Sequence, residues 1–211
     1  MFVPNKEFWD VFKKTPGAFS SAESLALMNI CKKVVSRGTY MELGVYRGKS
    51  TLSALQGLND GFFILVDPVF EDEEVIREVV GTLAQANPQC VQLNFVANYS
   101  TNVIPQQEHL AFVFVDSGSH DETVFDEVKM LEDRMVPGGI IAFHDFRNQF
   151  VSVEGAYNYL LGTGKYEEIL IDWEEIFKYV EENGTEHGNQ SWHVYPDLGH
   201  PPNFVGALRR I

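Results

Sequence analysis

The stretch MELGVYRGKST, residues 41–51, determines the fold class that we expect for the whole chain. It begins at the end of an apolar run and passes through two glycines, Gly44 and Gly48. It then reaches Ser50 and Thr51, residue types that are favoured where a helix begins. Glycine permits tight or positive-φ backbone and lets a ligand approach the main chain closely. The stretch therefore predicts a strand, a tight turn and a helix in direct succession.

The same alternation of apolar runs and helical patterns continues along the chain. Apolar runs, mostly continuous as in strands buried on both faces, predict strands at residues 39–44, 62–67, 91–97, 111–117 and 139–145. Helical patterns predict helices at residues 21–36, 50–58, 73–86, 121–135 and 151–161. Strands that alternate with helices are typical of βαβ units, which form a parallel sheet with helices on both faces. Ligands of such sheets bind at the carboxyl ends of the strands.

The C-terminal third predicts a strand at 166–172, a short acidic helix to about residue 183, and a last strand at 203–211. Residues 184–202 are rich in Gly, His, Asn and Pro, and we expect a variable loop that contributes to substrate specificity. The whole chain, 1–211, is then a single domain. Its expected architecture is a three-layer Rossmann-like α/β sandwich around a mostly parallel seven-stranded sheet, whose last strand is antiparallel.

The N-terminal segment, residues 1–20, is expected to be helical. Phe8 and Phe12 lie at i, i+4 spacing beside Trp9, which predicts a short helix docked on the core or on a neighbouring subunit. The tetrad at 20–23, Ser-Ser-Ala-Glu, fits the capping box that starts many helices.

The composition is that of an acidic globular protein. The 211 residues are 45% hydrophobic and 22% charged, which excludes global disorder and fibrous repeats. Lys and Arg number 16 against 30 Asp and Glu, and the net charge of −14 disfavours nucleic acid and anionic membranes as partners. The sequence shows no signal peptide, no membrane-length apolar run, and no CxxC pair or disulfide framework among its two cysteines, Cys31 and Cys90. We therefore expect a cytoplasmic protein.

The turn after the first strand indicates the class of ligand. Tyr46 stands where a dinucleotide-binding G-x-G-x-x-G turn needs its middle glycine, and the turn is not a P-loop either. Glu42 is an acid at an otherwise apolar strand end, where a carboxylate is costly without a partner. Asp67 lies 23 residues after Gly44, the spacing at which an acid on the second strand reaches a ribose hydroxyl. An adenosine ligand without phosphates fits this combination.

At this point the chain resembles a known group of enzymes. The stretch MELGVYRGKSTL is similar to the first motif of class I S-adenosylmethionine-dependent methyltransferases. In particular it resembles the cation-dependent O-methyltransferases of the catechol and caffeoyl-CoA type, and the related macrocin-type and cephalosporin-hydroxylase-like proteins. The resemblance covers roughly residues 15–146, and in this family the N-terminal segment forms part of a lid over the substrate.

The resemblance implies a set of cofactor-binding positions: Glu42, Gly44, Tyr46, Gly48, Ser50, Asp67, Ser100 and Asp116. Glu42 and the turn would face the methionine part of S-adenosylmethionine, and Ser50 would donate to its carboxylate. Asp67 would bind the ribose hydroxyls. Ser100 would lie near the adenine, although Ser is also a preferred N-cap residue on its own account.

A second group of polar residues follows the fourth and fifth strands. Asp116 and His120 lie in the run FVDSGSH, which ends the fourth strand. His144 and Asp145 end the fifth strand in FHDF. Two carboxylates and two imidazoles at one sheet edge suit a divalent cation or a general base. Three interpretations stay open: a cation site that uses Asp116 and Asp145, a metal-free site with His144 or His120 as the base, and polar strand ends without chemistry.

The family pattern DG(D/S)H…PGG…(H/D)D resembles this region, including Val136-Pro137-Gly138-Gly139 before the fifth strand. In cation-dependent relatives the positions of Asp116, His144 and Asp145 hold the metal. Those relatives more often carry Asp-Asn or Glu-Asp at the last pair. Magnesium and calcium prefer oxygen ligands, so an imidazole favours manganese, iron or zinc, or makes His144 a base instead.

The sequence therefore predicts methyl transfer from S-adenosylmethionine to a hydroxyl of a small molecule, with Asp116 and His144 as catalytic residues and a divalent cation such as Mg or Mn as an added cofactor. Two other functions stay open: a non-catalytic S-adenosylmethionine-binding module, and an NAD-dependent oxidoreductase on a Rossmann-like sheet. The missing middle glycine counts against NAD. A homodimer is an expectation from the family alone.

Overall fold

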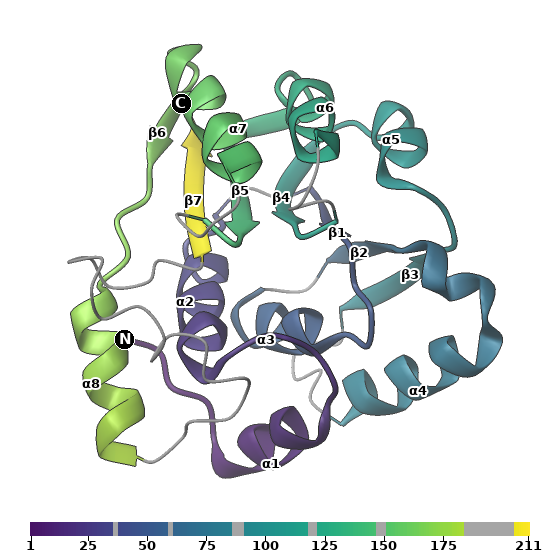
Figure 1. Cartoon of the computed structure of the whole chain (residues 1–211), viewed down its shortest axis with the longest axis vertical. Helices are drawn as coiled ribbons and strands as arrows, with labels where there is room; N and C mark the ends of the chain where they lie inside the picture. Colours follow the sequence, from purple (N-terminus) through teal and green to yellow (C-terminus); the bar gives the residue numbers. More distant parts are fainter. Residues whose placement is uncertain (36–37, 59–60, 86–90, 118–121, 147–150, 184–204) are drawn as a thin grey trace.

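The computed structural model describes residues 1–35, 38–58, 61–85, 91–117, 122–146, 151–183 and 205–211. Within them the chain forms a seven-stranded sheet in the order β3-β2-β1-β4-β5-β7-β6 (Figure 1). The strands are β1 (Thr39–Leu43), β2 (Phe62–Val66), β3 (Gln92–Val96), β4 (Leu110–Val115), β5 (Met135–His144), β6 (Tyr166–Glu168) and β7 (Val205–Arg210). The α-helices are α1 (Lys6–Lys14), α2 (Ser21–Cys31), α3 (Lys49–Gly57), α4 (Glu73–Ala84), α5 (Ser100–Val103), α6 (Thr123–Leu131), α7 (Val151–Gly162) and α8 (Trp173–Asn183). Two 3₁₀ helices, η1 (Pro68–Glu71) and η2 (Ile104–Gln106), follow β2 and α5.

The direction of the strands confirms the expected architecture. Strands β1 to β5 pair in parallel, and β7 pairs antiparallel with both β5 and β6. The central strand β4 is buried along its whole length because both faces of the sheet are covered. Its alternate side chains point to opposite faces: Phe112 and Phe114 to one apolar cluster, Val113 and Val115 to the other.

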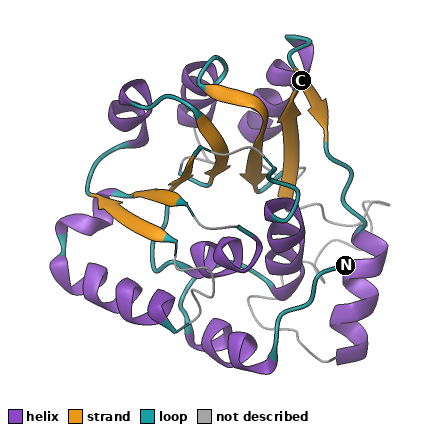
Figure 2. Ribbon diagram, turned by 180° about the vertical axis from the view of Figure 1, so that it is seen from behind, coloured by secondary structure: helices purple, strands orange, loops and turns teal. Residues whose placement is uncertain are grey.

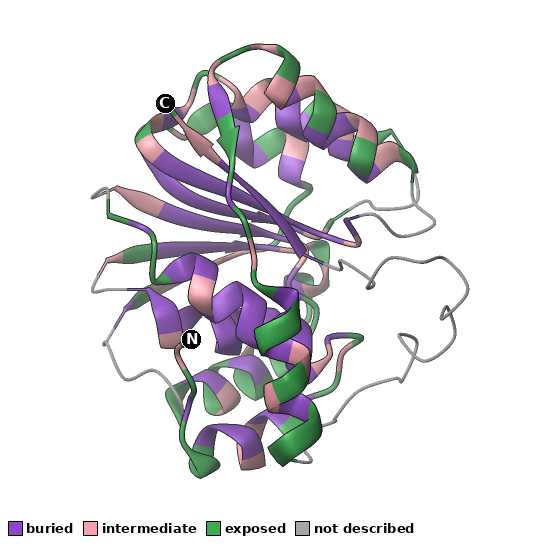
Figure 3. Cartoon of the chain, turned by 90° about the vertical axis from the view of Figure 1, so that its left-hand side faces the viewer, coloured by how far each residue is buried: buried purple, intermediate pink, exposed green. Residues whose placement is uncertain are grey.

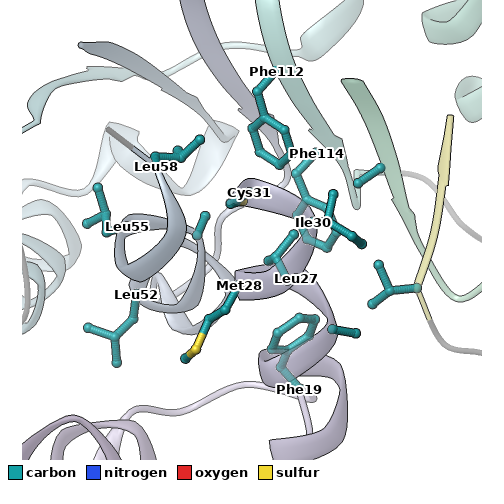
Figure 4. Close-up of a cluster of buried hydrophobic side chains, with 14 of the residues drawn as sticks. Phe19, Leu27, Met28, Ile30, Cys31, Leu52, Leu55, Leu58, Phe112 and Phe114 are labelled. Carbon is teal, nitrogen blue, oxygen red and sulfur yellow. The ribbon is translucent and has the colours of Figure 1, made fainter. Parts of the chain in front are cut away.

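Helices cover the two faces of the sheet as separate layers (Figures 2 and 3). The buried side chains of α1, α2, α3, α4 and α8 belong to one apolar cluster, and those of α5, α6 and α7 belong to the other. Figure 4 shows the first cluster, where Leu27 and Ile30 of α2 lie beside Phe112 and Phe114 of β4. Among the described helices none is both long enough and apolar enough to cross a membrane.

The N-terminal helix α1 docks on this core, as its aromatic spacing predicts. Phe8, Trp9 and Phe12 are buried in the first cluster. The rings of Phe8 and Phe12 stack with centroids 5.6 Å apart, and the Trp9 ring meets Phe12 edge-on at 5.5 Å. The capping box of α2 is also confirmed: Ser20 N–H donates to Glu23 Oε2 at 2.6 Å, and Glu23 N–H donates to Ser20 Oγ at 3.2 Å.

Several predicted boundaries are wrong. Helix α2 ends at Cys31 and not at residue 36, because Lys33 and Val34 donate three residues back, to Ile30 and Cys31, in a tightened last turn. Helix α6 ends at Leu131 rather than at residue 135, because β5 already begins at Met135.

The segment Val136–Gly139 lies within β5, and not before it as predicted. Leu110 pairs with Met135 and Phe112 pairs with Ile140, so this segment stands opposite Ala111 alone. Gly138, at φ +78°, permits the irregularity. In the C-terminal third the strand predicted at 166–172 shortens to β6, whereas α8 and the antiparallel β7 confirm the predicted helix and last strand.

Candidate functional site

The site begins where the strand order diverges. The chain leaves β1 for β2 on one side, while β4 lies on the other side, so the ends of β1 and β4 form the switch point where open parallel sheets bind ligands. Gly44 directly follows β1 at φ +81°, and Asp116 directly follows β4. A Cβ on Gly44 would lie 2.4 Å from the backbone oxygen of Asp116. Glycine is therefore required for the two strand ends to lie side by side.

Asp67 organises the turn that follows Gly44. Its Oδ2 accepts the backbone N–H groups of Val45 and Tyr46 at 2.8 and 2.7 Å, and its Oδ1 accepts that of Val69 at 2.9 Å. Tyr46, at φ +49°, turns its N–H toward the carboxylate. Sequence reasoning assigned Asp67 to the ribose hydroxyls of a ligand and did not foresee these contacts with the turn. A carboxylate offers about four acceptor positions, so capacity is left for a ligand hydroxyl.

Glu42 lies beneath the turn, completely buried. Ser50 Oγ donates to its Oε1 at 2.5 Å and Thr51 Oγ1 donates to its Oε2 at 2.6 Å. Burial raises the pKa of Glu42 to about 8, although both hydroxyl donors favour the charged form. Glu42 therefore joins the end of β1 to the first turn of α3.

The chemical centre lies at the ends of β4 and β5. Nδ1 of His144 is 2.9 Å from Asp116 Oδ1 and 3.5 Å from Asp145 Oδ2. Nε2 of the same ring is 2.9 Å from Oε1 of Glu23, which arrives from the first turn of α2. One donor atom each from Asp116, His144 and Asp145 lies within 4.8 Å of the others, a spacing that can hold a metal ion.

The charges at this centre favour a protonated imidazole. Burial lowers the pKa of His144, but the carboxylates of Asp116 and Glu23 outweigh it and hold the pKa well above its usual range. Burial also raises the pKa of Asp116, against the opposing effect of the imidazole. A protonated ring neither accepts a proton nor binds a metal until it loses its own proton.

A pocket of about 420 Å³ joins the glycine turn to this centre. Seven of the predicted residues line it: Gly44, Tyr46, Ser50, Asp67, Asp116, His144 and Asp145. Glu42, Gly48 and Ser100 lie outside its wall. His120 and the 184–202 loop fall outside the described residues. The geometry thus brings most of the predicted residues to a single opening.

Comparison with known families agrees with this arrangement. The family model described as a methyltransferase domain matches residues 41–146, half of the chain. The chain belongs to the methyltransferase-domain family. The resemblance inferred from the glycine turn is thereby confirmed. A search of curated proteins finds no match.

Solved structures share the methyltransferase fold at low sequence identity. An O-methyltransferase from Bacillus cereus in complex with SAH is 13% identical, with a TM-score of 0.61 over 100% of this chain and 93% of that one. The O-methyltransferase TomG from Streptomyces achromogenes, in complex with SAM, is 12% identical, with a TM-score of 0.60 over 100% and 92%. A protein from Corynebacterium glutamicum is 11% identical, with a TM-score of 0.66 over 100% and 92%. These similarities establish the fold.

Ser100 has a different local role in this methyltransferase domain from the N-cap that its residue type suggests. It is the first residue of α5, whose N-cap is Tyr99. Its hydroxyl donates to Oε1 of the buried Glu127, and the hydroxyl of Ser117 donates to the same atom. Ser117 lines the pocket, so Ser100 is linked to the pocket wall through this shared glutamate.

Sequence reasoning missed two residues of the candidate site. Glu23 fits the capping box completely, so the sequence offers no reason to expect a second role. One of its carboxylate oxygens caps α2, and the other contacts His144. Lys49 lines the pocket with its Nζ 3.4 Å from the Gly17 carbonyl oxygen, and burial lowers its pKa. The segment 16–19, which belongs to the N-terminal segment for which the resemblance implies a lid, forms one wall of the pocket.

Proposed function

We propose that this protein transfers a methyl group from S-adenosylmethionine to a hydroxyl group of a small molecule, assisted by a divalent cation. The observation that carries the proposal is the shared pocket, which joins the turn held by Asp67 to the cluster of Asp116, His144 and Asp145. The complexes of two structurally similar O-methyltransferases, one with SAH and one with SAM, support the choice of cofactor.

The turn suits a nucleoside that carries no phosphates. The N–H groups of Val45 and Tyr46, which a pyrophosphate would need, already bind the Asp67 carboxylate. This occupied turn disfavours NAD. We assign the ribose hydroxyls to Asp67, the methionine part to the turn and Ser50, and the adenine to the side of Ser100. Bound S-adenosylmethionine supplies a methyl group activated by its sulfonium charge.

The chemical centre fits a transition-metal cation better than magnesium. Asp116 and Asp145 offer carboxylate oxygens, and His144 offers Nδ1, which gives a mixed oxygen and nitrogen donor set. Such a set favours manganese, iron or zinc over magnesium and calcium. A cation held by these three side chains would lower the pKa of the acceptor hydroxyl and fix its orientation.

The charge on His144 weighs against the alternative in which its ring is the general base. Its pKa lies well above the usual range, so near neutral pH the ring already holds the proton it would have to accept. As a ligand of a cation, Nδ1 of His144 would have to be without this proton, because metal ligands must be deprotonated. Asp116 and Asp145 keep the acceptor oxygen in place, and alignment with the methyl carbon is the main contribution of the protein.

The N-terminal segment also contributes residues to the pocket. The segment 16–19 lines the pocket together with the turn, and the ring centroids of Phe19 and His144 lie 5.4 Å apart. We therefore propose that residues 1–20, whose helix α1 packs on the core, act as a cover whose last residues contact the substrate. The specificity for one small molecule over another would then arise partly at this wall.

The test measures conversion of S-adenosylmethionine to S-adenosylhomocysteine with a panel of sugar, phenol and polyketide hydroxyls. We expect turnover with Mn²⁺ that a chelator abolishes. Asp116→Asn should keep S-adenosylhomocysteine binding in calorimetry and lose turnover, while Asp126→Asn, on the exposed side of α6, should keep both. Normal turnover of Asp116→Asn would contradict the proposal. Cofactor binding without methylation of any hydroxyl would instead indicate a non-catalytic module.

A further inference from the structure

Both ring nitrogens of His144 contact carboxylates, and the carboxylate at Nε2 lies outside the lining of the pocket. Its Nδ1 lies 2.9 Å from Asp116 Oδ1, and its Nε2 lies 2.9 Å from Glu23 Oε1. The side chains of His144 and Glu23 are 9% and 7% exposed, so water does not compete for the second contact. Phe19 and Phe114 flank the imidazole with ring centroids at 5.4 and 6.3 Å.

Glu23 is itself rigidly placed. Its Oε2 accepts the Ser20 backbone N–H at 2.6 Å, and its own N–H donates to Ser20 Oγ at 3.2 Å. The first carboxylate oxygen therefore closes the start of α2, and the second is directed at the imidazole. A capping box needs only one of these oxygens. The contact with His144 is an additional use of the same side chain, across 121 residues of sequence.

We propose that Glu23 is a positioning residue that fixes the His144 ring with Nε2–H bound to the carboxylate and Nδ1 directed to the pocket. An imidazole nitrogen is more basic than a carboxylate oxygen, so the shared proton lies on Nε2 and Glu23 accepts it. The orientation of the ring follows from this bond, and so does its tautomer once Nδ1 has lost its proton. Nδ1 is then the only ring nitrogen directed at Asp116 and Asp145.

This arrangement has a chemical consequence for the cation site. A histidine that ligates a metal through one nitrogen commonly donates its other N–H to a carboxylate, which orients the ring and makes it a better ligand. Here the Glu23 carboxylate contacts Nε2 of His144, and Nδ1 of the same ring faces Asp116, where the cation would bind. The consequence for the cation rests on the proposed function, whereas the orientation of the ring does not. Loss of such a partner typically weakens metal binding by about 10- to 100-fold.

The experiment compares the wild-type chain with Glu23→Gln, Glu23→Ala and Ser20→Ala. Two quantities are measured on each: the ¹H–¹⁵N signals of the His144 ring without metal, assigned with His144→Asn, and the affinity for Mn²⁺ in calorimetry. We expect the protected Nε2–H signal to disappear in Glu23→Ala, and Mn²⁺ affinity to fall by about 10- to 100-fold. Glu23→Gln should recover part of both, because its amide oxygen still accepts a hydrogen bond.

Ser20→Ala is the matched control, because it weakens the same capping box without touching His144. It should leave the ring signals and the Mn²⁺ affinity unchanged. If Glu23→Ala does not fold, the weaker change expected in Glu23→Gln decides the question.

The inference is overturned if neither Glu23 variant changes the ring signals, or if Ser20→Ala reduces Mn²⁺ affinity as much as they do. A wild-type chain that shows the protected Nε2–H signal, lost in Glu23→Ala, but binds no Mn²⁺ supports the positioning role and contradicts the cation in the proposed function.

Discussion

Replacing Glu42 by glutamine should stabilise this protein at neutral pH. The side chain is completely buried, and burial raises its pKa from 4.5 to about 8. At pH 7 the folded chain therefore holds a proton on Glu42 that the unfolded chain has released. Each pH unit between the unfolded pKa and the working pH corresponds to about 1.4 kcal/mol. Taking up this proton therefore lowers the unfolding free energy by about 3 kcal/mol at pH 7. Glutamine has no proton to take up and nearly the same shape.

The hydrogen bonds of the site permit this exchange. Ser50 and Thr51 each donate to one oxygen of Glu42, and a hydroxyl can accept as readily as it donates. The amide of Glu42→Gln can thus accept from one hydroxyl and donate to the other. The gain should be small near pH 4.5 and should increase through pH 8, because the folded state of the wild type binds more protons over this window.

Urea denaturation at pH 5.5 and pH 7.0 measures the effect. The difference in unfolding free energy between Glu42→Gln and wild type should increase by about 2 kcal/mol between these two conditions. Glu181→Gln, on the exposed end of α8, reports what the loss of one charge contributes in a chain of net charge −14. A difference that does not change with pH, or a variant that is destabilised at pH 7, would refute the assignment of Glu42 as a buried neutral acid.

Three further changes probe the turn and the core. Gly44→Ala places a Cβ 2.4 Å from a backbone oxygen at φ +81° and should lower the unfolding free energy in urea by more than about 3 kcal/mol. Gly81→Ala, which has open space in α4, should raise the unfolding free energy by about 0.5–1 kcal/mol. Equal effects of the two changes would contradict the close approach of β1 and β4. Asp67→Ala removes three hydrogen bonds to backbone N–H groups and should weaken S-adenosylhomocysteine binding in calorimetry by about 100-fold. An unchanged affinity would show that Asp67 does not belong to the cofactor site. Phe12→Ala empties a completely buried position and should lower the unfolding free energy by about 3–5 kcal/mol, and a loss below about 1 kcal/mol would mean that α1 is not part of the core.

The strands and the switch point follow from local sequence because each rests on a short pattern. Continuous apolar runs between turn residues predict β1 to β5, and the glycines of the turn predict the tight passage from β1 to α3. The spacing from Gly44 to Asp67 predicts an acid that reaches a ribose hydroxyl, and the structure adds that its carboxylate binds the N–H groups of the turn itself. The start of β5 was predicted too late because Pro137 and Gly138 are read as a stop signal, while the bulge opposite Ala111 accommodates them.

The parts of the site that escaped prediction depend on contacts between distant segments. Glu23 carries a complete local explanation as a capping residue, and its bond to His144 joins positions 121 residues apart. Lys49 lines the pocket through its contact with the Gly17 carbonyl oxygen, 32 positions away in the sequence. Single-sequence patterns report helix and strand periodicity well, but they carry no signal for such tertiary contacts.

A crystal of the protein soaked with S-adenosylhomocysteine and Mn²⁺ tests the central claim most directly. The account predicts the ribose hydroxyls against Asp67 and a manganese anomalous signal between Asp116, His144 and Asp145, in one continuous pocket. A nucleoside bound elsewhere, or a manganese signal away from these three side chains, would contradict it.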